Sequence, residues 1–214
     1  MRPDLVIFDC DGVLVDTEPT SNAVLAANLT RHGLKLSTED CMRMFTGWSM
    51  ANVEKEALRL GATLPENWME EIYGEEFDAL KKGVPATEGI HEILDRLDAL
   101  HLPYCVVSNG SEDKMAITLG QNGLLERFMG AIFSAHTLKT SKPDPALFVA
   151  ALETFRVEPS RAVVIEDSVL GAIGAQRAGI SCYGFAPHHD GVDLAAAGAS
   201  IFKNMRQLVS LLNI

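Results

Sequence analysis

The sequence predicts an α/β fold, built on a mostly parallel sheet and interrupted after its first strand by a purely helical insert. Short apolar runs of strand length alternate with amphipathic helical patterns over most of the chain, an order typical of parallel sheets with helical crossovers. One long interval, residues 17–84, contains helical patterns and no strand-like run. The length of 214 residues is about 1.4 times that of a typical domain, which suits one domain with a smaller companion.

Five apolar runs are expected to form the strands, because they are short and carry few charges. Right-handed crossovers between parallel strands then place helices on both faces of the sheet. The runs are Leu5–Asp9, Pro103–Ser108, Ala131–Ser134, Ala162–Glu166 and Ser181–Phe185.

The helical patterns have apolar residues on one face. In residues 88–101, Ile90, Ile93 and Leu97 recur at the spacing of a helix that covers a core. Further patterns cover 111–122, 144–155 and 169–178, and Gly179 suits the left-handed residue that ends a helix. Within the insert, helices are expected at about 21–32, 37–44, 50–60 and 66–82, separated by glycines.

The predicted organisation is a core made of residues 1–16 and 85–214, with residues 17–84 as the inserted helical module. The net charge of −11 argues against sequence-independent binding to nucleic acid or to an anionic membrane, which needs clustered Lys and Arg. No apolar run approaches the roughly 20 residues of a membrane span. The first residues lack the apolar stretch of a secretory signal, so the cytoplasm is the expected compartment.

The cysteines predict no metal site or disulfide scaffold. None of them forms a C-x-x-C pair, and three lie in or beside apolar strand-like runs. We therefore expect buried, reduced thiols. The four residues are Cys10, Cys41, Cys105 and Cys182.

Two carboxylates, Asp9 and Asp11, lie at the carboxyl end of the first predicted strand. The carboxyl edge of the sheet is where ligands bind in open α/β folds, and residues two apart on an extended strand point to one side. Like charges in one crevice repel, so a cation or a proton is expected between them. Taken alone, the pair is also compatible with a solvated turn.

Polar residues also follow the second and fourth predicted strands. Ser108 and Asn109 precede a helix N-terminus, which favours a phosphate group but equally fits ordinary N-capping. Lys142 lies before a proline in a stiffened loop, where it holds an anion or is simply a surface lysine. Glu166 and Asp167 add two carboxylates at the same edge, and such oxygen ligands favour a hard cation such as Mg²⁺.

In this order and spacing, the motifs resemble those of the haloacid dehalogenase superfamily of phosphotransferases, and within it the β-phosphoglucomutase-like phosphatases. The resemblance spans almost the whole chain and implies a Rossmann-like core of three α/β/α layers with an inserted helical cap. The matching motifs are DCDGVLVD from Asp9 to Asp16, Ser108-Asn109, Lys142-Pro143, and EDSVLG from Glu166 to Gly171.

The resemblance implies a role for each acidic residue. Asp9 is the expected nucleophile that forms an aspartyl-phosphate, and Asp11 is the expected general acid and base. Mg²⁺ is expected to be held by Asp9, Asp11 and Asp167, with Glu166 as an outer or alternate ligand.

It also implies which residues contact the substrate. Ser108, Asn109 and Lys142 are expected to hold the oxygens of the transferring phosphoryl group, which is how such reactions gain most of their rate. The glycine loop of the insert is expected to face the substrate, although its tryptophan is equally able to pack the insert against the core. The three candidates there are Thr46, Trp48 and Ser49.

The function expected from this resemblance is Mg²⁺-dependent hydrolysis of small phosphorylated metabolites, such as sugar or sugar-acid phosphates, by a monomer. Dehalogenases and phosphonatases of the superfamily lack the second aspartate of the first motif, and Asp11 is present here. A phosphosugar mutase stays open as the alternative. Mutases carry a histidine after the first motif and basic residues in the cap loop, and neither 18–21 nor 45–50 contains them. A catalytically idle binding protein is disfavoured because both aspartates remain.

Overall fold

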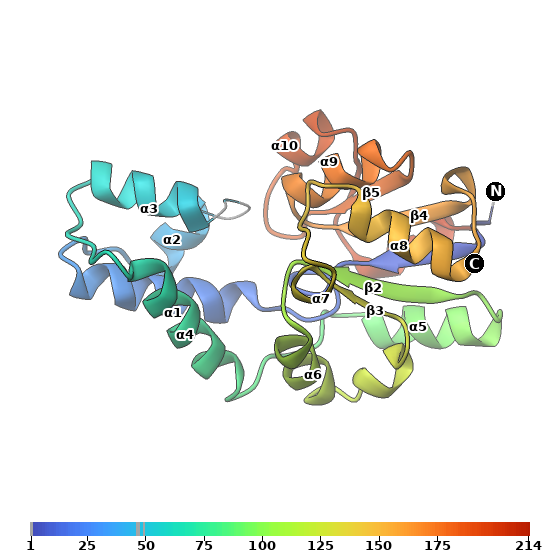
Figure 1. Ribbon diagram of the computed structural model, residues 1–214, viewed down its shortest axis with the longest axis horizontal. Helices are drawn as coiled ribbons and strands as arrows, with labels where there is room; N and C mark the ends of the chain where they lie inside the picture. The colour runs from blue at the N-terminus through green and yellow to red at the C-terminus, as the bar shows by residue number, and fades with distance from the viewer. Residues whose placement is uncertain (1, 46–47, 49) are drawn as a thin grey trace. The chain divides into compact units, whose positions relative to one another are not determined.

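The computed structural model describes residues 2–45, 48 and 50–214, and the chain separates into two compact units (Figure 1). We call Met1–Val15 together with Ala86–Ile214 the core unit, and Asp16–Pro85 the helical unit. Among the described residues, no helix has both the length and the apolar character needed to cross a lipid bilayer.

The core unit contains a six-stranded parallel sheet in the order β3-β2-β1-β4-β5-β6. Five strands confirm the predicted runs, and the Rossmann-like parallel sheet is confirmed with them. The sixth strand was not predicted, because Ser200–Phe202 is three residues long and begins with a polar residue. The strands are β1 (Leu5–Phe8), β2 (Tyr104–Ser108), β3 (Ile132–Ser134), β4 (Ala162–Glu166), β5 (Ser181–Phe185) and β6 (Ser200–Phe202).

Helices cover both faces of this sheet, and Figure 1 shows α5 and α8 on opposite sides of it. The period of two along β1 divides its side chains between the faces. Leu5 and Ile7 join the apolar cluster that includes Phe148 of α8. Phe8 meets the ring edge of Tyr104, which packs on Phe128. The helices of this unit are α5 (Ile90–Ala99), α6 (Glu112–Gly120), α7 (Ala135–Leu138), α8 (Ala146–Phe155), α9 (Val169–Arg177), α10 (Val192–Ala196) and α11 (Leu208–Leu211), with short 3₁₀ turns η1 (Leu125–Phe128), η2 (Pro159–Arg161) and η3 (Met205–Gln207).

Two helix ends in the core unit show common capping chemistry. Ser111 caps α6 by accepting a hydrogen bond from the Lys114 N–H at 3.2 Å. Gly179 follows α9 with a φ of +75°, the left-handed conformation predicted for it. All four cysteines are buried and unbridged, as predicted.

The helical unit consists of α1 (Glu18–Arg31), α2 (Thr38–Phe45), α3 (Met50–Arg59) and α4 (Trp68–Leu80). Its core is a separate apolar cluster that includes the fully buried Trp68. The indole N–H of Trp68 donates to Oδ1 of the buried Asn28 at 2.7 Å, so the polar atoms of this core are paired. The expected four helices are present among the described residues.

Candidate functional site

The carboxyl ends of β1, β2 and β4 bring the predicted core residues to one edge of the sheet. The strand order reverses at β1, and the crevice at such a reversal is where ligands bind in open α/β folds. Asp9 follows β1 directly and its N–H donates to the Ile165 carbonyl of β4 at 2.9 Å. Ser108 ends β2 and Glu166 ends β4, so parallel pairing delivers these side chains to the same place.

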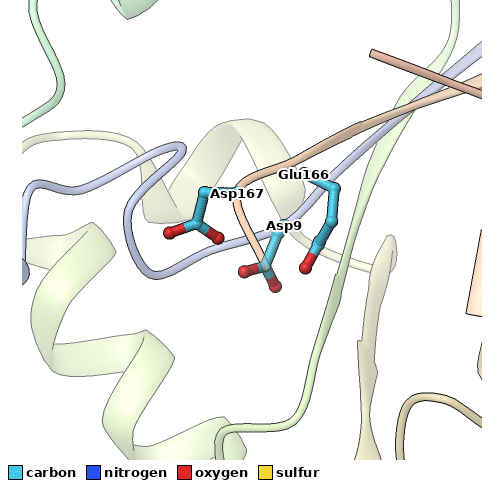
Figure 2. A group of neighbouring side chains, drawn as sticks. All are labelled: Asp9, Glu166 and Asp167. Atoms are coloured by element: carbon cyan, nitrogen blue, oxygen red, sulfur yellow. The ribbon is translucent and has the colours of Figure 1, made fainter. Parts of the chain in front are cut away.

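Three carboxylates form a cluster at this edge (Figure 2). Oxygen atoms of Asp9, Glu166 and Asp167 all lie within 4.8 Å of one another. Carboxylate oxygens without nitrogen or sulfur ligands are the donor set that hard cations such as Mg²⁺ prefer. The cluster therefore fits the metal that the sequence predicts.

Lys142 is buried inside this cluster, with 4% of its surface exposed. Its Nζ donates to Asp9 Oδ1 at 2.7 Å and to Glu166 Oε2 at 3.0 Å. Burial lowers the pKa of Lys142, but the two carboxylates outweigh burial and raise it, so the ammonium stays charged. The lysine is thus a permanent cation placed against the predicted nucleophile.

The charge at Asp9 is incompletely balanced. Burial and the neighbouring Glu166 raise the pKa of Asp9 to about 7, although Lys142 acts in the opposite direction. The single positive charge of Lys142 faces the carboxylates of Asp9, Glu166 and Asp167. The buried cluster therefore keeps a net negative charge. A divalent cation bound there would offset that charge and favour the ionised form of Asp9, a second reason why the site suits a metal.

The loops around Lys142 are tied to the end of β2. Asn109 Oδ1 accepts a hydrogen bond from the Lys142 N–H at 2.9 Å, and Arg177 donates to the Pro143 carbonyl at 3.1 Å. Ser108 is 2% exposed and its Oγ accepts from the Gly110 N–H at 3.0 Å. Asn109 therefore positions the lysine loop, a contact that the sequence did not predict.

Two glycines leave room for the carboxylates. A Cβ atom on Gly12 would lie 1.9 Å from Asp167 Oδ2, and the φ of Gly12 is +76°, which also favours glycine. A Cβ atom on Gly171 would lie 1.9 Å from Glu166 Oε1. Ser168 Oγ donates to that same oxygen and accepts from the Gly171 N–H, so glycine lets α9 begin directly behind Glu166.

Replacing Gly171 with alanine is expected to destabilise the protein by about 1–3 kcal/mol, the usual cost of overpacking. The added methyl must displace the buried Glu166 carboxylate, which Lys142 and Ser168 hold. Urea denaturation measures the change, with Gly74→Ala as the control. Gly74 also lies in a helix, but a methyl group added there would have no atom within 4 Å to displace. Equal stability of the two variants would contradict the expectation.

Asp11 is paired with a residue that the sequence motifs did not predict. Lys114 Nζ of α6 donates to Asp11 Oδ2 at 3.0 Å, across 103 positions of sequence. The only signal was a lysine soon after the Ser108-Asn109 motif. The acidic Glu112 and Asp113 beside it made this helix turn resemble a solvated surface.

Of the three predicted residues of the glycine loop, Trp48 is the one that the structure describes. Thr46 and Ser49 lie outside the described residues. Trp48 belongs to the helical unit, where its ring meets Phe45 edge-on at 5.8 Å between centroids and 49% of it is exposed.

Comparisons with known proteins agree with this geometry. The family model described as haloacid dehalogenase-like hydrolase matches residues 6–185. The 6-phosphogluconate phosphatase of Escherichia coli K12 is 30% identical over 98% of this chain and 95% of its own length. Validoxylamine A 7′-phosphate phosphatase of Streptomyces hygroscopicus subsp. limoneus is 32% identical over 90% of each chain. The crystal structure of a hydrolase from Deinococcus radiodurans R1, with bound phosphate and sodium, is 28% identical with a TM-score of 0.84, covering 99% of this chain and 96% of that one.

Proposed function

Because the chain belongs to the haloacid dehalogenase-like hydrolase family, we propose that it hydrolyses small phosphorylated metabolites with Mg²⁺, through an aspartyl-phosphate intermediate. The chain is a phosphoric monoester hydrolase. The names of its phosphatase relatives support sugar phosphates and sugar-acid phosphates as substrates. The observation that carries the mechanism is the buried Asp9 carboxylate, held by the Lys142 ammonium at 2.7 Å beside two further carboxylates.

In the first half of the proposed reaction, a carboxylate oxygen of Asp9 forms a bond to phosphorus. The bond between phosphorus and the ester oxygen breaks, and its electron pair goes to that oxygen. Asp11 gives its proton to the ester oxygen, so the product leaves as a neutral alcohol. We assign Ser108, at the end of β2, the role of donating its hydroxyl hydrogen to a phosphoryl oxygen.

In the second half, a water molecule attacks phosphorus in the aspartyl-phosphate. Asp11, ionised by the first step, takes the proton of this water. The bond between phosphorus and Asp9 breaks, which releases inorganic phosphate and restores the Asp9 carboxylate. Lys142 stabilises the negative charge on the phosphoryl oxygens and on the departing carboxylate. Asn109 keeps the lysine loop in place throughout.

The proposed Mg²⁺ ligands are Asp9, Asp167 and the backbone carbonyl of Asp11, with Glu166 behind them. When bound, the metal supplies positive charge that reduces repulsion between Asp9 and the dianionic phosphate. Glu166 is fully buried and already contacts Lys142 and Ser168, which suits an outer place better than direct ligation. Gly12 keeps the first loop clear of Asp167.

We propose that the helical unit acts as the cap that selects the substrate, through Thr46, Trp48 and Ser49. The half-exposed indole of Trp48 is a surface suited to stacking on a sugar ring. A capped core with a single site can work as a monomer, so we propose a monomer. Water is the proposed acceptor of the phosphoryl group, because the histidine and cap-loop basic residues of mutases are missing from the sequence.

Phosphate release from a panel of phosphorylated sugars and sugar acids tests this function. We expect inorganic phosphate to form with Mg²⁺ and activity to fall to background after chelation, because several carboxylates then face the substrate unscreened. ³¹P NMR of the same reactions distinguishes hydrolysis from isomerisation. Isomerised sugar phosphate without free phosphate, or full activity after chelation, would contradict the proposal.

A further inference from the structure

The proposed mechanism does not use an ion pair that lies at the edge of the site, between Lys114 and Asp11. The pair joins Lys114 Nζ to Asp11 Oδ2 at 3.0 Å, and both side chains are only partly exposed, 21% and 29%. Partial burial makes such a pair more effective than a surface pair, because water screens it less.

The two partners lie in different kinds of backbone, a helix and a loop. Lys114 lies in the first turn of α6, where its N–H donates to Ser111 Oγ at 3.2 Å and its carbonyl accepts from Thr118 Oγ1 at 3.1 Å. Asp11 lies in the loop that follows β1. The contact thus lets a helix fix the side chain of a loop residue.

Gly110 lies beside both side chains of the pair. A Cβ atom on Gly110 would lie 3.6 Å from Lys114 Cδ and 3.7 Å from Asp11 Oδ2, so the lysine side chain runs along this glycine. The Gly110 carbonyl accepts from Ser134 Oγ at 2.7 Å, which ties this turn to β3. The turn beside the lysine is therefore held by β3.

The two carboxylate oxygens of Asp11 have different environments. Oδ2 accepts the hydrogen bond of Lys114, whereas Oδ1 is buried and has no hydrogen-bond partner among the described residues. A buried acceptor without a partner costs free energy, so its presence calls for an explanation, and a catalytic role is one. Oδ1 is thus the oxygen left to exchange a proton with the substrate.

We propose that Lys114 is a positioning residue for the general acid: it anchors Oδ2 of Asp11 so that Oδ1 meets the ester oxygen of the substrate. The inference rests on the proposed function, in which Asp11 protonates the leaving group. It assigns Lys114 no contact with the transferring phosphoryl group itself. Lys114 therefore affects the reaction rate only when the leaving group needs a proton.

Leaving-group dependence tests this role directly. The alkoxide of a sugar is a strong base and needs a proton to leave, whereas p-nitrophenolate is a weak base and leaves without one. We compare kcat/KM for the best sugar phosphate of the panel and for p-nitrophenyl phosphate. For each substrate, kcat/KM reports only the steps up to alcohol release, before the aspartyl-phosphate is hydrolysed.

Lys114→Met is expected to lower kcat/KM about 100-fold for the sugar phosphate, since a misplaced acid loses much of the gain of general acid catalysis. For p-nitrophenyl phosphate, the expected loss in kcat/KM is below about fivefold, because p-nitrophenolate leaves without general acid catalysis. Lys114→Arg keeps the charge and is expected to show a smaller loss of the same kind. It also provides the test if the methionine variant does not fold.

Two further variants separate this inference from the proposed function. Asp11→Asn is expected to show the same leaving-group pattern as Lys114→Met, and the double variant is expected to be no worse than Asp11→Asn, because the lysine acts through the aspartate. Lys81→Met is the control, since it removes another lysine–aspartate pair of 3.0 Å, that with Asp78. We expect this variant to leave kcat/KM unchanged for both substrates.

Several outcomes would overturn the inference. Equal losses with both substrates in Lys114→Met would assign the lysine a general structural role. If the loss of activity in the double variant equals the product of the losses in the two single variants, Lys114 acts independently of Asp11. If Asp11→Asn itself affects both substrates equally, the general-acid assignment is wrong and the inference falls with it.

Discussion

Replacing Asp9 with asparagine is expected to lower phosphate release at least about 10⁴-fold, in the range seen when other enzymes lose their nucleophile. An amide is a poor nucleophile towards phosphorus, so no aspartyl-phosphate forms. The change conserves shape and removes one negative charge from the crowded site, where burial and Glu166 already raise the pKa of Asp9. The fold is therefore expected to be as stable as that of the native protein.

Two measurements check this prediction. Phosphate release gives the loss of activity, and mass spectrometry of acid-quenched enzyme detects the phosphorylated intermediate in the native protein and not in the variant. Asp4→Asn is a suitable control, because Asp4 pairs with Arg161 at the protein surface. Mg²⁺-dependent phosphate release that survives in Asp9→Asn would show that another residue is the nucleophile.

Replacing Lys142 with methionine is expected to remove activity and also to destabilise the fold by about 3–5 kcal/mol. The lysine is 4% exposed and its ammonium bonds to two buried carboxylates, so its loss leaves Asp9 and Glu166 facing each other without a counter-ion. Leaving a buried charge uncompensated is among the most costly single changes in a protein.

Urea denaturation measures this change in the free energy of unfolding. The double variant Lys142→Met with Glu166→Gln removes one of the uncompensated carboxylates, so it is expected to recover much of the stability without recovering activity. Lys81→Met again serves as the control, since its pair with Asp78 is exposed and contributes little. A fully stable Lys142→Met protein would show that the buried ion pairs are not what holds the site.

The sequence alone was sufficient for features that depend on local patterns. The five apolar runs became β1 to β5 because strands buried on both faces of a parallel sheet are short and apolar throughout. The interval 17–84 was predicted to be helical because it contains no such short apolar run. Motif order placed Asp9, Ser108 and Glu166 at the sheet edge, because parallel strands end on the same side.

Other features depended on contacts between distant parts of the chain. The edge strand β6 has only three residues, and its pairing with β5, not its composition, makes it a strand. The predicted helices begin or end up to three residues from the expected limits, since helix ends fray and the apolar periodicity does not mark the last residue. The hydrogen bond from the Lys142 N–H to Asn109 joins two loops that the sequence showed only as separate motifs.

The sequence by itself determined which residues gather: the carboxylates, the lysine of the Lys142-Pro143 motif and the strands that carry them. Only the tertiary structure decided how they pair. It placed Lys142 between Asp9 and Glu166, and Lys114 against Asp11 across 103 positions. The reason is physical: burial patterns repeat locally along a chain, whereas an ion pair depends on the positions of side chains that only the folded sheet brings together.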